Sequence, residues 1–298
     1  MSPARSPRST EPDPSRPRAL FVLGSPRSGT TLIGSYLGSS PSALDLGEYG
    51  GFHVAHGVVP AVIGRFPGPL RDRYLADLCA HAQRFAEDAA RENGRAWYCD
   101  GTPWNLRIAA ALADQLPDAL FVLLLRHYSG TVQSLRRSYA AGFHWAGSTF
   151  EESARVWSAM YERVADLPSE RTIVVGYDRL GMSPAGTLEE LENGLRAHGI
   201  DPTTLDRRQL TVSHARPGTP GPTVAVMEGT AVRLRPFQTF VPEAWSGDIH
   251  AAVWPVVGEV HQMLQARYPG DYLSPPPPVG LTQHDEIHGL IPFEARGW

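Results

Sequence analysis

Residues 24–31 of this 298-residue chain read GSPRSGTT, a stretch rich in glycine and hydroxyl side chains between two apolar segments. An apolar run at 19–23 precedes it, and a helical pattern at 31–37 follows it. Strand, tight loop and helix therefore come in the order that turns backbone N–H groups toward an anion at the positive end of a helix. Gly24 and Gly29 have the G-x-x-x-x-G spacing of a phosphate-binding loop, so the sequence predicts an anion site after the first strand.

The predicted loop differs from nucleoside-triphosphate loops in its cation. ATP- and GTP-binding loops continue with Lys-Ser or Lys-Thr, whose lysine reaches the β- and γ-phosphates, whereas position 30 here is threonine. All 27 basic residues of the chain are arginine, so we expect Arg27 to supply the positive charge. The other predicted anion contacts in the loop are Ser25, Ser28, Gly29, Thr30 and Thr31.

Composition argues against several classes of partner. A net charge of −4 and a pI near 6.3 give no reason to expect nucleic acid or an anionic membrane. The two cysteines are too few for a disulfide scaffold and lack metal-ligand spacing, so no metal is expected. No segment approaches the roughly 18 apolar residues of a membrane span. Residues 1–18 resemble neither a signal peptide nor an anchor, and we expect a cytoplasmic protein whose oligomeric state is open.

The order of the predicted elements indicates an α/β fold. Short apolar runs alternate with helical patterns, and the run at 119–125 is apolar throughout, which is typical of a parallel strand covered on both faces. We predict a P-loop-containing, doubly wound parallel sheet with flanking helices, whose ligands bind beyond the carboxyl ends of the strands. The predicted strands are 19–23, 41–48, 96–99, 119–125 and 171–175.

The remaining segments are predicted from periodicity and from turn residues. The predicted helices after the first are 70–93, 103–116, 130–140, 149–167, 184–198 and 246–268. Gly50, Gly51 and Gly57 indicate an irregular segment, and 201–242 is weakly patterned. The predicted domains are a disordered tail at 1–18, one catalytic domain at 19–273 and a Pro-rich tail at 274–298.

A second cation ends a buried strand. The run at 119–125 stops at Arg126, where an ATPase is expected to have a carboxylate that holds magnesium. Ser134 follows eight residues later on the next predicted helix, and together the two side chains predict a second phosphate site separate from the loop. A surface ion pair for Arg126 and an ordinary helix serine at 134 are the alternatives.

These motifs resemble those of the sulfotransferases that use 3′-phosphoadenosine 5′-phosphosulfate (PAPS). GSPRSGTT followed by leucine looks like the family's 5′-phosphosulfate loop, and Arg126 with Ser134 looks like its 3′-phosphate motif. A third segment, VVGYDRL at 174–180, is similar to the family's V-x-Y-E-x-L segment and implies that Tyr177 contacts the nucleotide. The resemblance covers about 19–200 and implies a bacterial sulfotransferase similar to the tyrosylprotein branch, with PAPS as donor and PAP as product.

The resemblance also implies a catalytic base. The segment ending in Glu48 is similar to the one that carries the catalytic glutamate of tyrosylprotein sulfotransferases, so Glu48 and Arg27 are the predicted catalytic residues. A carboxylate acts efficiently near neutrality only if its pKa is raised, and a solvated loop carboxylate is the alternative. Rival bases are His53, His56 and His144.

The acceptor is expected to be a hydroxyl of a small molecule, such as a secondary metabolite or a glycolipid, and a carbohydrate or a peptide tyrosine are the alternatives. His53, His144 and Trp145 are the predicted acceptor contacts, and Tyr49, Phe52, Phe143 and Trp145 are candidates for an aromatic-lined pocket.

The sequence departs from the family pattern at Gly101. Related bacterial enzymes have Glu-Lys-Thr-Pro where this chain has DGTP at 100–103, and family lysines help the leaving group to depart. Arg27, Thr30 and His127 are the candidates to replace that lysine. If none does, the chain is a non-catalytic PAP-binding protein; a P-loop kinase is a further alternative, disfavoured by the missing lysine.

Overall fold

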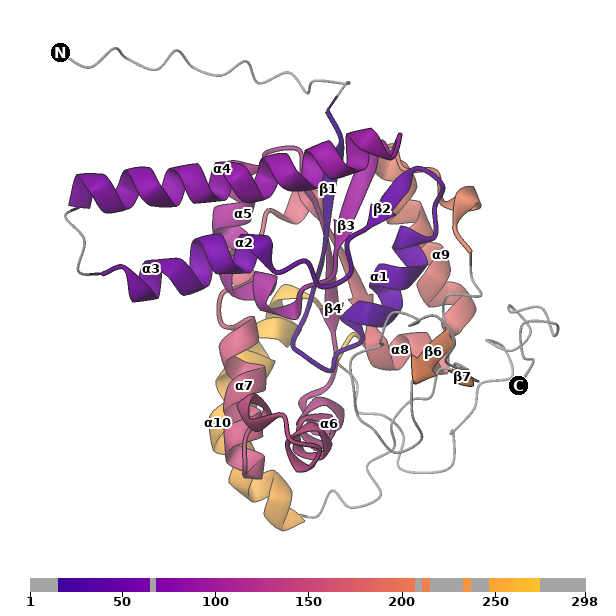
Figure 1. The fold of residues 1–298 in the computed structure, drawn as a ribbon. Coiled ribbons are helices and arrows are strands. Elements are labelled where there is room, and N and C mark those ends of the chain that lie inside the picture. The colour runs from indigo at the N-terminus through magenta and orange to yellow at the C-terminus, as the bar shows by residue number, and fades with distance from the viewer. Residues whose placement is uncertain (1–15, 65–67, 207–210, 215–232, 237–246, 274–298) are drawn as a thin grey trace.

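The protein is built around one five-stranded sheet (Figure 1). The computed structural model describes residues 16–64, 68–206, 211–214, 233–236 and 247–273. All strand pairs of the sheet are parallel, in the order β2-β3-β1-β4-β5, which confirms the predicted parallel α/β fold. The strands are β1 Arg18–Leu23, β2 Ala43–Asp45, β3 Trp97–Asp100, β4 Leu120–Leu125 and β5 Thr172–Gly176.

Helices cover both faces of the sheet because the buried strands are apolar on both sides. In β1, Leu20 and Val22 pack into one core, whereas Phe21 and Leu23 pack into the other. The first core is covered by α1 Thr30–Gly38, α8 Tyr177–Met182 and α9 Pro184–Ala197. The second is covered by α4 Gly68–Glu92, α5 Ala109–Gln115, α6 Tyr128–Ala140, α7 Phe150–Tyr161 and α10 Gly247–Arg267.

The prediction of an irregular segment around Gly50 and Gly57 is wrong. This segment is helical, with α2 Gly51–His53, a π-helical stretch Val54–Val58 and α3 Val59–Val62. Gly57 lies within the helical segment beside the His53 ring. A Cβ at position 57 would lie 3.1 Å from this ring, so glycine leaves room for it.

Two further segments differ from their predictions. The predicted helix at 103–116 begins as a 3₁₀ helix, Pro103–Ile108, and becomes α-helical only in α5. The weakly patterned segment at 201–242 contains an antiparallel pair, β6 Thr211–His214 and β7 Arg233–Pro236. The predicted tails lie outside the described residues, apart from 16–18, where Arg18 already begins β1.

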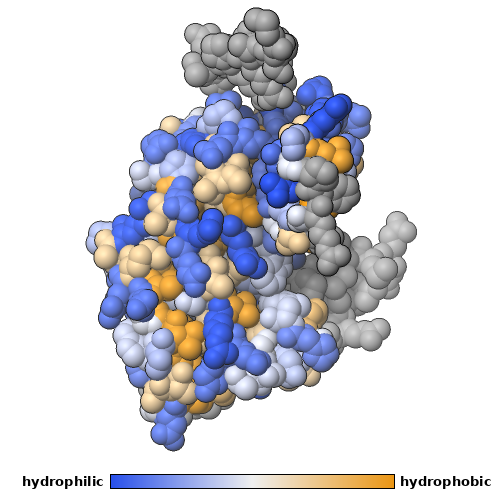
Figure 2. All heavy atoms as spheres, turned by 90° about the vertical axis from the view of Figure 1, so that its left-hand side faces the viewer, coloured by the Kyte–Doolittle hydropathy of each residue, from blue (hydrophilic) through white to orange (hydrophobic). Residues whose placement is uncertain are grey.

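Helix α4 and the segment from α2 to α3 project together from the body of the protein (Figure 1). Figure 2 shows this side of the surface, where separate hydrophobic areas lie among hydrophilic side chains. Val54, Val58, Leu70 and Tyr74 are among the exposed hydrophobic residues of these helices. Within the described part of the chain, no helix combines the length and the apolar character needed to cross a membrane.

Candidate functional site

Three of the predicted anion-binding residues meet at the carboxyl edge of the sheet. Arg27 lies in the β1–α1 loop, Arg126 ends β4, and Ser134 lies on α6. A guanidinium N–H of Arg126 donates to the carbonyl oxygen of Arg27 at 2.6 Å, and Nε of Arg27 donates to Oγ of Ser134 at 3.2 Å. Residues up to 107 positions apart in sequence therefore form one cationic cluster.

The loop conformation brings Tyr177 onto this cluster. Gly29 has φ = 96°, and a Cβ there would lie 2.4 Å from the Tyr177 ring, so only glycine permits this approach. The Arg126 guanidinium lies 4.2 Å from the centroid of the same ring, which is a cation–π contact. Arg27 has φ = 72° and is the only described non-glycine residue with a positive φ, so backbone strain is concentrated at the cluster.

The two serines of the loop hydrogen bond within the loop itself. Oγ of Ser28 donates to the carbonyl oxygen of Ser25 at 2.5 Å, and Oγ of Ser25 donates to that of Pro26 at 3.2 Å. Helix α1 begins after Gly29 without a side-chain cap, and the first N–H groups of a helix lack intrahelical acceptors. The groups of this loop that best suit an anion are therefore the backbone N–H groups of Thr30 and Thr31, together with Arg27.

Two carboxylates act electrostatically on the cluster, Glu48 on Arg27 and the buried Asp178 on Arg126, but neither lies within ion-pair distance of its arginine. Neither Arg27 nor Arg126 forms an ion pair with a described residue, although Arg126 is only 4% exposed. Burial, and then the charge of Arg126, lower the pKa of Arg27. Nε of Arg126 is buried without a hydrogen-bond partner in the described part of the chain. An anion with two separated charged groups fits this cluster, because it would neutralise both guanidinium groups.

Glu48 interacts electrostatically with the cluster through Arg27. It sits in a turn after β2, between Gly47 at φ = 58° and Gly50 at φ = 70°, rather than at the end of a longer strand as expected. The side chain of Glu48 is exposed to solvent, but nearby protein atoms partly desolvate its carboxylate. This desolvation, and then the charge of Asp100, raise the pKa of Glu48, whereas the charge of Arg27 lowers it. A carboxylate with a raised pKa that faces an arginine suits a general base.

Asp100 positions the segment that carries Glu48, and the sequence analysis did not identify this role. Its Oδ1 accepts hydrogen bonds from N of Thr102 at 2.9 Å and from Oγ1 of Thr102 at 2.6 Å. Thr102 Oγ1 in turn accepts from N of Gly50 at 2.9 Å, and N of Gly101 donates to the carbonyl oxygen of Gly47 at 2.8 Å. These bonds hold the turn of Glu48 at both ends. The Asp-x-Thr spacing is typical of an Asx turn and is the sequence signal that would have predicted this arrangement.

His127 does not carry the charge that its proposed role requires. Burial, and then His261 and His250, lower its pKa to about 3, so the ring is neutral at physiological pH. The ring caps α6, because Nδ1 accepts a hydrogen bond from N of Ser129 at 3.3 Å. Of the three candidates to replace the missing lysine, only Arg27 therefore offers a positive charge, whereas His127 and Thr30 are neutral groups.

The aromatic side chains divide into two groups. His53 lies 6.2 Å from Trp104, and Trp104 lies 5.5 Å from Trp145, measured between ring centroids, so these rings form a row. His144 instead packs against Tyr139, at 5.5 Å. Trp104 was missed by the sequence analysis, although it directly follows the DGTP motif.

Two other predicted pocket residues belong to the protein interior or its packing. Phe52 is fully buried in the core beside Phe21, so it cannot line a pocket. Tyr49 stacks on Phe85, and its hydroxyl donates to the carbonyl oxygen of Ala82. His56 hydrogen bonds to Gln115 away from the cationic cluster.

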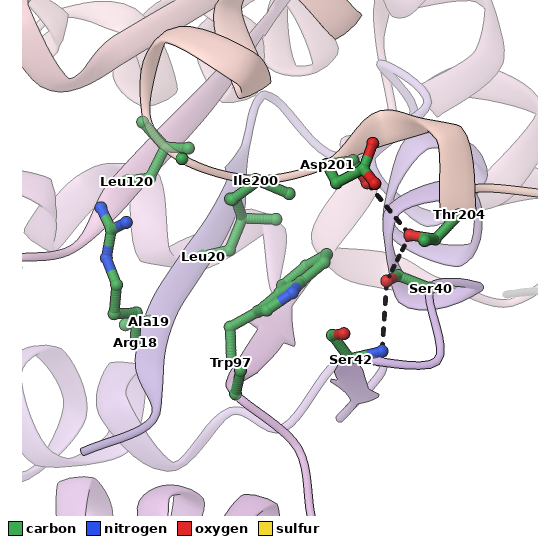
Figure 3. A pocket seen from close by; sticks show the side chains of 12 residues that line it. Arg18, Ala19, Leu20, Ser40, Ser42, Trp97, Leu120, Ile200, Asp201 and Thr204 are labelled. Atoms are coloured by element: carbon green, nitrogen blue, oxygen red, sulfur yellow. Dashed lines mark hydrogen bonds between the residues drawn. The ribbon is translucent and has the colours of Figure 1, made fainter. Parts of the chain in front are cut away.

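A separate cavity lies at the opposite edge of the sheet. Figure 3 shows its walls, in which Arg18, Leu20, Trp97 and Leu120 come from the amino ends of the strands. Its volume is about 300 Å³. Ligands of parallel sheets bind at the carboxyl edge, so this cavity is not the candidate site. Among the described residues, no group of three or more His, Cys, Asp or Glu side chains is placed to hold a metal ion.

Comparisons with known proteins bear on the family. Residues 64–198 match the model described as the sulfotransferase family, and this match begins beyond the phosphate-binding loop. Protein-tyrosine sulfotransferase 2 of Gallus gallus is 24% identical over 277 residues, which cover 86% of this chain and 71% of that protein.

Solved sulfotransferase structures align with this chain at low similarity. A sulfotransferase from Alicyclobacillus acidocaldarius aligns with a TM-score of 0.45 and 14% identity, covering 85% of this chain and 95% of that one. The sulfotransferase domain from the curacin biosynthetic pathway aligns with a TM-score of 0.43 and 18% identity, covering 60% and 74%. The family match and the vertebrate enzyme therefore show that this chain is similar to sulfotransferases.

Proposed function

We propose that this protein transfers the sulfuryl group of PAPS to a hydroxyl of a small-molecule acceptor. The observation that carries the proposal is the cluster in which Arg126 donates to the Arg27 carbonyl and Arg27 donates to Ser134, with no carboxylate paired to either arginine in the described chain. PAPS carries a 5′-phosphosulfate and a separate 3′-phosphate, and the cluster offers a cation to each.

The residues that would hold PAPS come from three elements. The backbone N–H groups of Thr30 and Thr31 and the guanidinium of Arg27 would hold the 5′-phosphosulfate. Arg126 and Ser134 would hold the 3′-phosphate, and the Tyr177 ring would lie beside the nucleotide. When bound, PAPS supplies the activated sulfuryl group, and PAP is the product.

Glu48 would act as the base that takes the proton of the acceptor hydroxyl. Its raised pKa makes it a stronger proton acceptor than an ordinary carboxylate, and the turn held by Asp100 and Thr102 fixes its position. Arg27 would neutralise negative charge that develops on the leaving phosphate, in place of the lysine that is missing at Gly101. By analogy with phosphoryl transfer, positioning and electrostatics then provide most of the rate.

The row of His53, Trp104 and Trp145 would bind the acceptor. Trp145 is 43% exposed at the end of this row, so a flat apolar group can reach it from solvent. Nδ1 of His53 is buried without a hydrogen-bond partner among the described residues, and burial lowers the pKa of this ring. His53 is therefore neutral near pH 7 and is the rival base if Glu48 is dispensable.

The proposal is tested first by thermal unfolding with PAP, adenosine 5′-phosphosulfate and ATP, with and without magnesium. PAP should raise the melting temperature in the absence of magnesium, because it neutralises both arginines. Arg27→Ala should remove this shift, whereas Arg73→Ala, at an exposed position on α4, should keep it. Stabilisation by ATP that requires magnesium would instead favour a P-loop kinase.

Turnover separates an enzyme from a binding protein. Sulfated product from labelled PAPS in a screen of hydroxyl acceptors would establish transfer. Tight binding of PAP with no product from any acceptor, and no slow hydrolysis of PAPS, would favour the non-catalytic alternative.

A further inference from the structure

A cysteine, a histidine and a glutamine meet outside the sulfotransferase site. Cys79 lies on α4, His56 on the π-helical stretch and Gln115 at the end of α5. Sγ of Cys79 lies 3.6 Å from Nδ1 of His56, and Nε2 of His56 lies 2.5 Å from Oε1 of Gln115. Figure 1 shows α4 running beside the α2-to-α3 segment and α5, so three separate elements build the group.

The ion pair between Arg16 and Glu87 determines which groups donate and which accept in the hydrogen bonds around Gln115. Glu87 accepts two guanidinium N–H groups of Arg16, at 2.8 and 2.6 Å, so its carboxylate only accepts. Gln83 therefore directs Nε2 at Glu87 and Oε1 at Nε2 of Gln115, both at 2.9 Å. Nε2 of Gln115 also donates to the carbonyl oxygen of Cys79 at 3.0 Å, which leaves its Oε1 to accept.

This network assigns the tautomer of His56. Because Oε1 of Gln115 accepts, Nε2 of His56 carries the imidazole proton and Nδ1 keeps its lone pair. The thiol of Cys79 is then the donor to Nδ1. A thiol beside a neutral imidazole that is oriented by a third group is the arrangement of an activated nucleophile.

We propose that Cys79 is a nucleophilic thiol that forms covalent adducts with α,β-unsaturated carbonyl compounds, with His56 as its base and Gln115 as a positioning residue. In this addition, a bond forms between Sγ and the β-carbon, and the π electron pair of the C=C bond moves to the carbonyl oxygen. The thiol proton passes to Nδ1 of His56 and then to the α-carbon. The adduct is neutral, and no oxidant or reductant is consumed.

The two cysteines of the chain differ in access. Cys79 is partly exposed, whereas Cys99 lies in β3 and is fully buried, so it is an internal reference. Burial raises the pKa of the Cys79 thiol above 9.0 and lowers the pKa of His56 below 6.5. Between these two values the pair holds one proton on sulfur and a free base on Nδ1, so the reactive protonation state does not change with pH.

The test is the pH dependence of alkylation by N-ethylmaleimide, measured for each cysteine by peptide mass spectrometry. Only the thiolate of a thiol without a base reacts. While the pH is below the pKa of such a thiol, its reaction rate therefore rises about tenfold for each unit by which the pH increases. With His56 as base, the Cys79 rate should change less than about twofold between pH 7 and 8.5. Cys99 should stay unlabelled until the protein is unfolded.

Variants separate the base from a packing effect. His56→Gln should restore the tenfold slope, and Gln115→Met should slow Cys79 labelling, while His81→Gln, at an exposed position on α4, should leave the flat profile unchanged. A tenfold slope in the unaltered protein, or no labelling of Cys79 before unfolding, would overturn the proposal. Both of these results come from the native chain, so the test does not depend on the folding of a variant or on sulfotransferase activity.

Discussion

The turn that carries Glu48 is held by one buried carboxylate, and removing it should measurably weaken the fold. Asp100 is completely buried, and its carboxylate accepts hydrogen bonds from Thr102, from Nδ2 of Asn105 at 2.9 Å and from the backbone N–H of Tyr49. Asp100→Ala leaves these donors without an acceptor in a region that water does not reach. Asp100→Asn keeps the shape and one acceptor oxygen.

The expected magnitudes follow from these partners. Each buried donor left unpaired costs about 1–3 kcal/mol, and the four donors to Asp100 sum to about 4 kcal/mol at the low end. Relief of the buried negative charge offsets about 1 kcal/mol of this, so Asp100→Ala should lower the free energy of unfolding by about 3 kcal/mol. Asp100→Asn should cost about 1 kcal/mol or less, because Oδ1 of Asn105 is buried without a partner and can accept from the new amide once Asn105 flips.

Urea unfolding at pH 7 measures both variants, with Asp114→Ala, an exposed position on α5, as the control. Burial raises the pKa of Asp100 in the folded state, so the folded protein binds a proton more tightly than the unfolded chain. The Asp100 carboxyl therefore stabilises the fold at low pH, and this stabilisation is lost as the pH rises from the unfolded pKa through the raised folded pKa. The stability of Asp100→Asn should lack this pH dependence. Equal, small effects of Asp100→Ala and Asp100→Asn would refute the claim that this carboxylate holds the turn.

Four other changes test individual residues. Glu48→Gln should keep PAP affinity but lower kcat at least about 100-fold, and in the unaltered protein kcat should fall as pH drops through the raised pKa of Glu48, because its carboxylate must be free. Arg126→Ala should weaken PAP about 10- to 100-fold in calorimetry but leave adenosine 5′-phosphosulfate, which lacks the 3′-phosphate, nearly unchanged. Gly29→Ala should lower the free energy of unfolding by about 1–3 kcal/mol, because its Cβ would meet the Tyr177 ring at φ = 96°. Gly101→Lys gives its Cβ only ordinary contacts, the nearest at 3.5 Å, and should raise kcat if leaving-group charge limits the rate.

Controls and contrary results accompany these four changes. Gly68→Ala, where a Cβ has no neighbour within 4 Å, should leave stability nearly unchanged. Full turnover in Glu48→Gln would make His53 the base. Equal losses for PAP and adenosine 5′-phosphosulfate in Arg126→Ala would place Arg126 away from the 3′-phosphate. An unchanged kcat in Gly101→Lys would mean that Arg27 already supplies the charge.

The sheet was predictable because its strands carry a strong local signal. All six residues of β4 are buried, and the run is apolar from end to end, so no pattern competes with a covered parallel strand. The helical segment after Gly50 was not predictable from its glycines. Its structure comes from packing of Phe52 and Ala55 into the core, which is a long-range effect that overrides local preference.

The residues of the candidate site that belong to a recognisable sequence motif could be predicted. Arg27, Arg126 and Ser134 were each predicted as anion contacts, but their mutual hydrogen bonds depend on the order of strands β1 and β4 in the sheet. Trp104 was missed because its partners, His53 and Trp145, are distant in sequence. Asp100 was missed because its link to the Glu48 segment runs through Tyr49, although Thr102 and Asn105 are local partners. The burial of His127, which lowers its pKa and removes its charge, depends on tertiary packing and could not be predicted from the sequence.

The charge of the cluster links binding to stability. The fold brings Arg27 and Arg126 together although their like charges repel, and burial, followed by the charge of Arg126, lowers the pKa of Arg27. The bond from Arg126 to the Arg27 carbonyl and the contact with Tyr177 hold the geometry without neutralising it. An anion that reaches both guanidinium groups removes the repulsion and the desolvation penalty together, so part of its binding free energy is already stored in the free protein. A donor with two separated anionic groups gains from both arginines, whereas a donor with one group leaves the second arginine buried and unpaired, and this difference favours a 3′-phosphorylated nucleotide at a loop that has no lysine.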